Sequence, residues 1–166
     1  MFRRELAQIS LFNDLEQADL DLLAPLFDPI CMNVGQVVFE QGRSADYLFV
    51  LLEGEVVVNF KPYDGPPLTV AHIHPGGVFG WSAILGRQVY TSIAVAAADS
   101  TAIRIRGDEL RCLCERKPQT GVAVLERLAG AIAARLNSTH AQIFTMLSES
   151  MDLSLKATSQ RRSCHE

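Results

Sequence analysis

The sequence predicts a mainly β protein with flanking helices, in which short strands form a jelly roll. Three observations predict it: β-rich apolar runs recur at regular intervals, glycine-containing turns separate them, and helical patterns lie on both sides. Short strands at this spacing are typical of sandwiches and barrels. With 166 residues, 48% of them hydrophobic, the chain has the size of one domain and can bury one core.

The N-terminal section is predicted to be helical. Over the first 27 residues, leucine and phenylalanine recur at mixed three- and four-residue steps. Asn13 and Asp19 are the candidate N-caps, and Pro29 is expected to close the section.

The strand section follows. The predicted strands lie at 37–40, 47–52, 55–60, 68–74, 92–97 and 101–106. Asp64-Gly65 is predicted to close a hairpin, and Glu53-Gly54 to close another.

Two helices are predicted after the strands. The first begins at Gly107 and runs to about Cys114, because Pro118 stops it. The second is expected to begin near Gln119 and to carry a heptad seam. One seam position holds Val122, Ala129, Leu136, Ile143 and Ser150, and the other holds Leu125, Ile132, Thr139, Met146 and Leu153. Eight of these ten residues are apolar, which predicts a coiled-coil contact and a homodimer through about 119–150.

The alternative is that this helix packs only on its own sandwich. The last residues, 151–166, carry no pattern and are expected to be a disordered tail. Residues 1–150 are therefore predicted to form a single domain that includes the seam helix.

Composition excludes several classes of function. A net charge of −4 argues against a nucleic-acid surface, which needs clustered lysine and arginine. No stretch approaches the ~18 apolar residues of a membrane span, and the start shows no signal peptide. We expect a cytoplasmic protein with no membrane partner, whose four cysteines are thiols.

No catalytic or metal-binding residue is predicted. His72 and His74 have the spacing used by jelly-roll metal enzymes of the cupin kind, but a metal needs three or four converging ligands. No carboxylate follows closely, so exposed strand histidines are the simpler interpretation. The sequence also has no G-x-S-x-G stretch and no cysteine with a base beside it. We therefore predict that the chain is not an enzyme.

Residues 77–95, GVFGWSAILGRQVYTSIAV, form the candidate ligand site. They combine a glycine turn, small residues that open a short helix, and a polar pair before a strand. A helix N-terminus offers N–H groups and partial positive charge to an anion. The expected donors are the amides near Ser82, Ala83 and Ile84, and Gly80 lets the backbone approach closely.

Four stretches carry a resemblance to a known family. They are LFNDLEQADLDLLAPLF, VGQVVFEQGRSADYLFVLLEGEVVV, and PGGVFGWSAIL followed by YTSIAV. Together they resemble the cyclic-nucleotide-binding domain of the catabolite-activator type over residues 10–150. The resemblance implies a double-stranded β-helix (jelly roll) with N-terminal helices and a long C-terminal dimerisation helix. It also implies a role in signal transduction and makes residues 77–95 the phosphate-binding cassette.

The chain departs from the family at both charged positions of the cassette. In the family, a glutamate after the glycine accepts the ribose hydroxyl, and an arginine ten positions later pairs with the cyclic phosphate. Trp81 stands at the glutamate position and Thr91 at the arginine position, while Ser92 keeps the adjacent hydroxyl. Losing a charge-assisted contact costs about 1.5–3 kcal/mol, which lowers affinity roughly ten- to a hundredfold.

Three interpretations of the altered cassette follow. In the first, Trp81 walls in a different ligand held by Thr91, Ser92 and the helix amides, with Arg87 or Tyr90 as a displaced donor. In the second, Trp81 fills the pocket and the domain is a ligand-free interaction module. In the third, a cyclic nucleotide still binds in a changed pose. The ligand would be a cyclic nucleotide or another phosphorylated small molecule, and no other cofactor is predicted.

Matching the long helix to the family places base contacts near Thr139 and His140. The predicted ligand-binding residues are Gly80, Trp81, Ser82, Ala83, Arg87, Tyr90, Thr91, Ser92 and Thr139.

Many relatives carry a DNA-binding domain after the seam helix. Only sixteen residues follow Ser150 here, which is too few for a helix-turn-helix. We therefore predict a homodimeric sensor that binds no nucleic acid directly and signals to a separate partner protein. The alternative is a transcription regulator of the catabolite-activator type that lacks its DNA-binding part. In either case, ligand in the cassette is expected to move its short helix against the seam helix.

Overall fold

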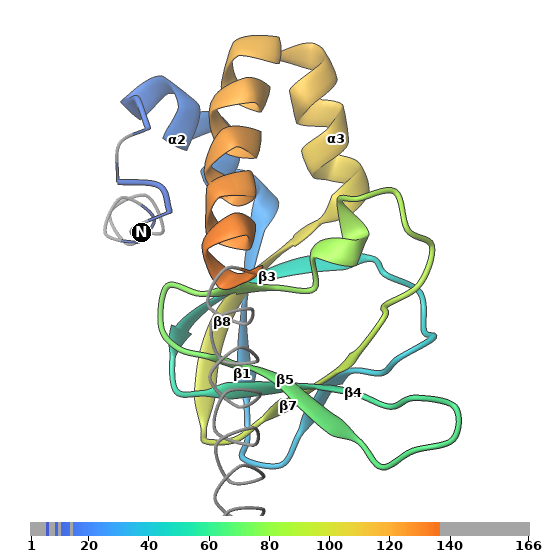
Figure 1. Cartoon of the computed structure of the whole chain (residues 1–166). Coiled ribbons are helices and arrows are strands. Elements are labelled where there is room, and N and C mark those ends of the chain that lie inside the picture. Colours follow the sequence, from blue (N-terminus) through green and yellow to red (C-terminus); the bar gives the residue numbers. More distant parts are fainter. Residues whose placement is uncertain (1–5, 7–8, 10, 14, 137–166) are drawn as a thin grey trace, which may run out of the picture. The chain divides into compact units, whose positions relative to one another are not determined.

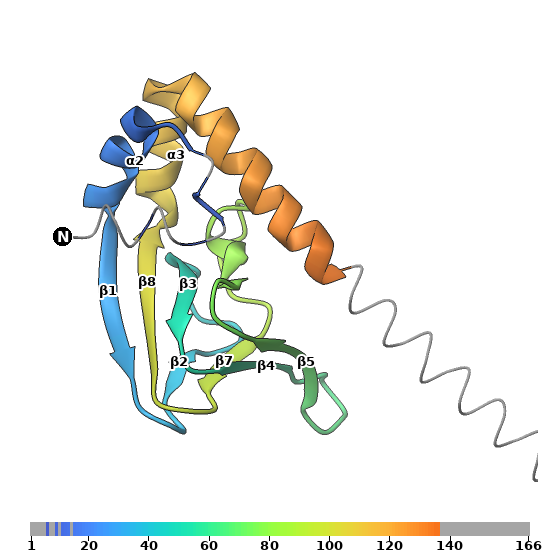
Figure 2. The same ribbon diagram turned by 90° about the vertical axis from the view of Figure 1, so that its left-hand side faces the viewer.

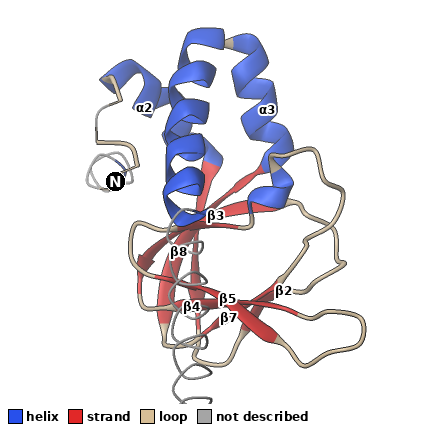
Figure 3. Ribbon diagram, viewed as in Figure 1, coloured by secondary structure: helices blue, strands red, loops and turns tan. Residues whose placement is uncertain are grey.

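The computed structural model describes residues 6, 9, 11–13 and 15–136 (Figure 1). The chain divides into two compact units, Met1–Ile132 and Ala133–Glu166. In the first unit, helices gather at one end of a β sandwich, as the colouring by secondary structure makes plain (Figure 3). No helix among the described residues is long and apolar enough to cross a membrane.

Two four-stranded antiparallel sheets make up the sandwich. The strands are β1 (Phe27–Met32), β2 (Val37–Phe39), β3 (Tyr47–Glu53), β4 (Val56–Phe60), β5 (Leu68–Ile73), β6 (Val78–Phe79), β7 (Ile93–Ala96) and β8 (Ser100–Arg106). One sheet has the order β1-β8-β3-β6 and the other β2-β7-β4-β5. Most consecutive strands change sheet, so the predicted jelly roll is confirmed.

Strand β3 of the first sheet is buried on both faces, because the helices cover one face and the second sheet covers the other. Along β3, Leu48 and Val50 belong to the hydrophobic cluster shared with the helices, whereas Phe49 and Leu51 face the other sheet. Strands covered on both sides read as unbroken hydrophobic runs, which explains the sequence YLFVLL at 47–52. In Figure 2, β1, β8 and β3 run side by side below the helices.

One of the two predicted hairpins is wrong. The Asp64-Gly65 turn joins β4 to β5, which pair with each other, so that hairpin is confirmed. The Glu53-Gly54 turn joins β3 to β4, which lie in different sheets. This turn therefore carries the chain across the sandwich, which a local turn pattern does not reveal.

The predicted N-terminal helix is too long. The described helices are α2 (Gln17–Leu23) and the 3-10 turn η1 (Ala24–Leu26), and β1 begins at Phe27. Pro29 lies inside β1, opposite Ile103 of β8. Proline is tolerated there because β1 is an edge strand. Asp19 lies within α2 rather than at its N-cap, and its carboxylate accepts a hydrogen bond from the Thr120 hydroxyl.

The short helix after the strands is confirmed as α3 (Gly107–Arg116). Residues 118–132 of the first unit are helical, and so are residues 133–136 of the second. Residues 137–150 and the predicted tail lie outside the described part of the chain, so the extent of the seam helix and of the single domain stay predictions.

The two faces of this last helix differ. Val124 and Leu128, each 2% exposed, pack into the cluster between the helices and the first sheet. The seam residues Val122 and Leu125 are 56% and 44% exposed. One face of the helix therefore packs on its own domain, while the predicted seam lies on the other face.

Candidate ligand-binding site

The cassette begins with a tight turn at Gly80, between β6 and the 3-10 helix η2 (Trp81–Ala83). Gly80 has φ of 75°, in the left-handed region. A Cβ there would lie 2.8 Å from the Tyr47 carbonyl oxygen and 2.9 Å from a ring carbon of Phe49. Glycine is therefore required both by the backbone conformation and by the close approach of β3.

The amides of the cassette helix bond largely within the turn. The amide of Ala83 donates to the Gly80 carbonyl at 3.2 Å, and that of Ile84 to the Trp81 carbonyl at 3.0 Å. Ser82 and Ala83 are buried. Two of the three predicted donor amides thus have backbone acceptors inside the turn that forms η2.

The cassette helix is attached to α3. The Arg111 guanidinium donates from Nη1 to the Ala83 carbonyl oxygen at 2.8 Å. Gly107 approaches the same residue so closely that a Cβ there would lie 2.8 Å from the Ala83 carbonyl carbon. Trp81 and Ile84 are partly buried against the cluster that contains Val124. The contacts of Ala83 therefore connect η2 to α3, and movement of η2 against the seam helix stays a prediction.

The remaining predicted site residues have different surroundings. Thr91 and Arg87 are exposed, and Ser92 is half-buried before β7. Thr139 and His140 lie outside the described residues.

Tyr90 is a core residue. Its hydroxyl accepts a hydrogen bond from the Tyr47 amide at 3.0 Å and donates one to the Tyr47 carbonyl oxygen at 2.8 Å. Its ring stacks on Phe39, with centroids 3.9 Å apart and an interplanar angle of 14°. This stack fills part of the space between the two sheets.

Burial raises the pKa of the Tyr90 hydroxyl above its ordinary value of 10. The folded state therefore keeps this proton to a higher pH than the unfolded chain does. Its contribution to stability is complete below pH 10 and is lost as pH rises through the raised pKa, by at most about 1.4 kcal/mol per pH unit. Denaturant titrations between pH 8 and 11 should show a shallower alkaline loss for Tyr90→Phe than for the parent.

The matched control for this prediction is Tyr63→Phe, because Tyr63 is fully exposed. It should reproduce the parent's pH dependence. Equal slopes for Tyr90→Phe and the parent would contradict a raised pKa at Tyr90.

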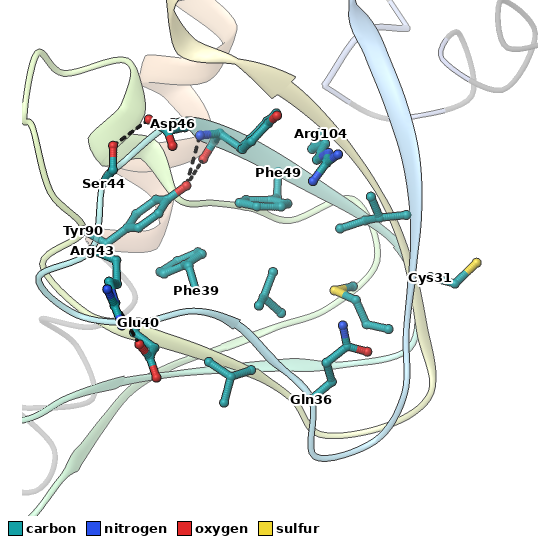
Figure 4. Close-up of a pocket in the computed structure, with 15 residues that line it drawn as sticks. Cys31, Gln36, Phe39, Glu40, Arg43, Ser44, Asp46, Phe49, Tyr90 and Arg104 are labelled. Atoms are coloured by element: carbon teal, nitrogen blue, oxygen red, sulfur yellow. Dashed lines mark hydrogen bonds and ion pairs between the residues drawn. The ribbon is translucent and has the colours of Figure 1, made fainter.

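A cavity of about 600 Å³ lies between the sheets, near the edge strands β1 and β2 (Figure 4). Among the eight predicted site residues that the structure describes, only Tyr90 lines it. Arg104 of β8 lines it too and was missed. The alternation in TAIRIR is the sequence pattern that places Arg104 on the same face as Ala102, opposite Ile103.

The strand histidine His72 is exposed and lies beside a carboxylate, with its Nδ1 2.7 Å from Oε1 of Glu55. Among the residues that the structure describes, no three His, Cys, Asp or Glu side chains gather as a metal site would require.

Comparisons with known proteins agree on one family. The family model of the cyclic nucleotide-binding domain matches residues 32–117, more than half of the chain. The CRP-like cAMP-activated global transcriptional regulator of Mycobacterium tuberculosis is 25% identical over 140 residues, covering 84% of this chain and 62% of that protein. The solved structure of the Thermus thermophilus catabolite activator protein has a TM-score of 0.66 and 26% identity. The match covers 83% of this chain and 62% of the Thermus thermophilus chain.

An enzyme also matches part of the chain. Acetyltransferase Pat of Mycolicibacterium smegmatis is 33% identical over 93 residues, which cover 56% of this chain and 28% of that protein. The chain thus spans less than two thirds of the length of these relatives.

Proposed function

Because the chain belongs to the cyclic nucleotide-binding domain family, we propose that it is a homodimeric, non-enzymatic regulatory domain that senses a small ligand and signals to a separate partner. The proposed ligand is a nucleotide or another small anion at the cassette, contacted by Thr91 and Ser92. Its proposed setting is the cytoplasm, where Cys31, Cys112 and Cys114 remain thiols.

The attachment of η2 to α3 is the observation that carries this proposal. Arg111 and Gly107 both contact Ala83, so a ligand that displaces η2 must disturb the start of α3. Trp81 packs in the same cluster as Val124 and extends the disturbance toward the last helix. A ligand shifts this arrangement only if it binds one state more tightly than the other.

The exposed seam supports the dimer. Val122 and Leu125 each leave more than two fifths of their surface in solvent, and Ala129 is exposed on the same heptad seam. Neighbouring apolar side chains on one helix face mark contact surfaces for a second helix. In the proposed dimer, this face meets the same face of a second copy.

Restoring the missing cation tests the position of the ligand site. Thr91→Arg should tighten cyclic AMP binding roughly ten- to a hundredfold, because it returns a charge-assisted contact to the phosphate. Isothermal titration calorimetry measures the affinity, and Trp81 emission reports the cassette, since Trp81 is the only tryptophan in the chain.

Gln88→Arg is the matched control, because it adds the same charge at an exposed position in the same loop. It should leave the affinity within a factor of about two of the parent, apart from general charge attraction. Equal gains in the two variants, or no cyclic AMP binding by Thr91→Arg at millimolar concentration, would contradict a phosphate position beside Thr91.

A second candidate function is that of a ligand-free interaction module. The packing of Trp81 into the helical cluster favours it, since the side chain is already engaged with protein. The two functions differ in one measurement: a module leaves Trp81 emission unchanged by every nucleotide and phosphorylated metabolite, yet still forms the dimer. With either function, association with a DNA-binding partner or domain would make the protein a transcription regulator.

A further inference from the structure

The cavity between the sheets contains a cation that the proposed function does not use. Arg104 is half-buried on β8, opposite Phe49 of β3 in the strand register. Ile103 and Ile105 point to the helical cluster, so Arg104 points between the sheets. Figure 4 shows its guanidinium beside the ring of Phe49.

This guanidinium is only partly satisfied. It lies 4.3 Å from the centre of the Tyr47 ring, a cation–π contact. Its Nε is buried and donates no hydrogen bond to any residue in the described part of the chain. A buried donor without an acceptor is costly, and a planar guanidinium fork matches a carboxylate.

Arg43, at the mouth of the cavity, differs from Arg104. It is largely exposed and lies 3.2 Å from the Glu40 carboxylate. Asp46 also lines the cavity and accepts a hydrogen bond from Ser44 at 2.6 Å. The two acidic residues disfavour a doubly charged ligand, so the cavity suits a monoanion whose charge faces Arg104.

Aromatic rings form part of the cavity wall, beside apolar residues of β1 and β2 such as Ile30 and Val37. Phe39, Phe49 and Tyr90 line it and are buried. Phe39 and Phe49 have ring centroids 5.8 Å apart. Apolar and aromatic walls with a few polar groups that fix orientation are typical of small-molecule sites, and the volume lies within their usual range.

We infer that this cavity binds a small aromatic carboxylate, with its ring against Phe39 and Phe49 and its carboxylate on Arg104. The site is distinct from the cassette, from which only Tyr90 reaches the cavity. The inference therefore goes beyond the proposed function: absence of a dimer or of cassette binding would leave it standing.

The test uses the full chain and three probes: benzoate, cinnamate and indole-3-carboxylate, each compared with its neutral primary amide. Nuclear magnetic resonance titrations follow the arginine Nε–H signals of ¹⁵N-labelled protein. At least one carboxylate should bind and shift the Arg104 Nε–H signal, and its amide should bind roughly tenfold or more weakly.

Two variants locate the carboxylate. Arg104→Gln should weaken binding at least roughly tenfold, because it removes the charge and the fork. The matched control is Arg106→Gln, two residues along the same strand, where the arginine is exposed and pairs with Asp108 at 2.9 Å. It should leave the affinity within about twofold of the parent.

Three outcomes would overturn the inference. They are no binding by any of the carboxylates at about 10 mM, equal affinity for acid and amide, or equal weakening in the two variants. If Arg104→Gln does not fold, the shift of the Arg104 Nε–H signal in the parent protein still tests whether the carboxylate binds at Arg104.

Discussion

Placing glutamate at Leu125 is expected to dissociate the proposed dimer. Leu125 lies on the exposed seam and is 44% exposed in the single chain. In a two-fold dimer the substitution introduces two like charges into one apolar contact. A cost of about 3 kcal/mol raises the dimer dissociation constant roughly a hundredfold.

Sedimentation equilibrium measures this effect across a concentration series. Glu126→Gln is the control, since Glu126 is the exposed neighbouring residue but lies off the seam. It should leave the mass of the parent unchanged. A parent that is monomeric at high micromolar concentration would refute dimerisation through this face.

Gly54→Ala should be the most destabilising glycine substitution in the sandwich. Gly54 has φ of 88°, and a Cβ there would lie 2.6 Å from the Asp99 carbonyl oxygen and 2.7 Å from Ser100 Cα. The Ser100 hydroxyl, also in the way, is held by Glu55 and Ala98. Backbone strain and overpacking together should lower the free energy of unfolding by about 2–5 kcal/mol.

Gly42→Ala separates the two effects. Gly42 has φ of 84°, but a Cβ there would meet nothing within 4 Å. Denaturant unfolding should therefore show a loss of only about 1–2 kcal/mol, the cost of the backbone conformation alone. Equal losses of unfolding free energy for Gly54→Ala and Gly42→Ala would mean that the turn at Gly54 has more room for a methyl group than the structure shows.

Sequence patterns determined most of the fold because strand alternation and helix periodicity are local. They predicted α3 and the strands β2 to β5, β7 and β8, within a few residues at each end, but not the short strand β6. They missed β1, because its pairing with β8 links residues far apart in the chain. The same reason explains the error at Glu53-Gly54, since a turn motif does not record which sheet its strands join.

The candidate site was less predictable than the fold. The cassette and its two missing charges follow from the resemblance to the family, whereas the hydrogen bonds of the η2 amides depend on the exact turn. Tyr90 looked like a loop donor, yet its partners Phe39 and Tyr47 are remote in sequence. Arg104 looked like an ordinary strand residue until its neighbours on β3 were known.

The junction between β8 and α3 connects the cavity with the cassette. Arg104 lines the cavity, and three residues later Gly107 touches Ala83 of the cassette. A ligand in the cavity and a ligand in the cassette would both contact residues at the ends of this short backbone segment. If an occupant of the cavity changes the affinity of the cassette for its ligand, thermodynamic reciprocity requires the cassette ligand to change the affinity of the cavity by the same factor. A domain coupled in this way would respond most strongly when both ligands are present.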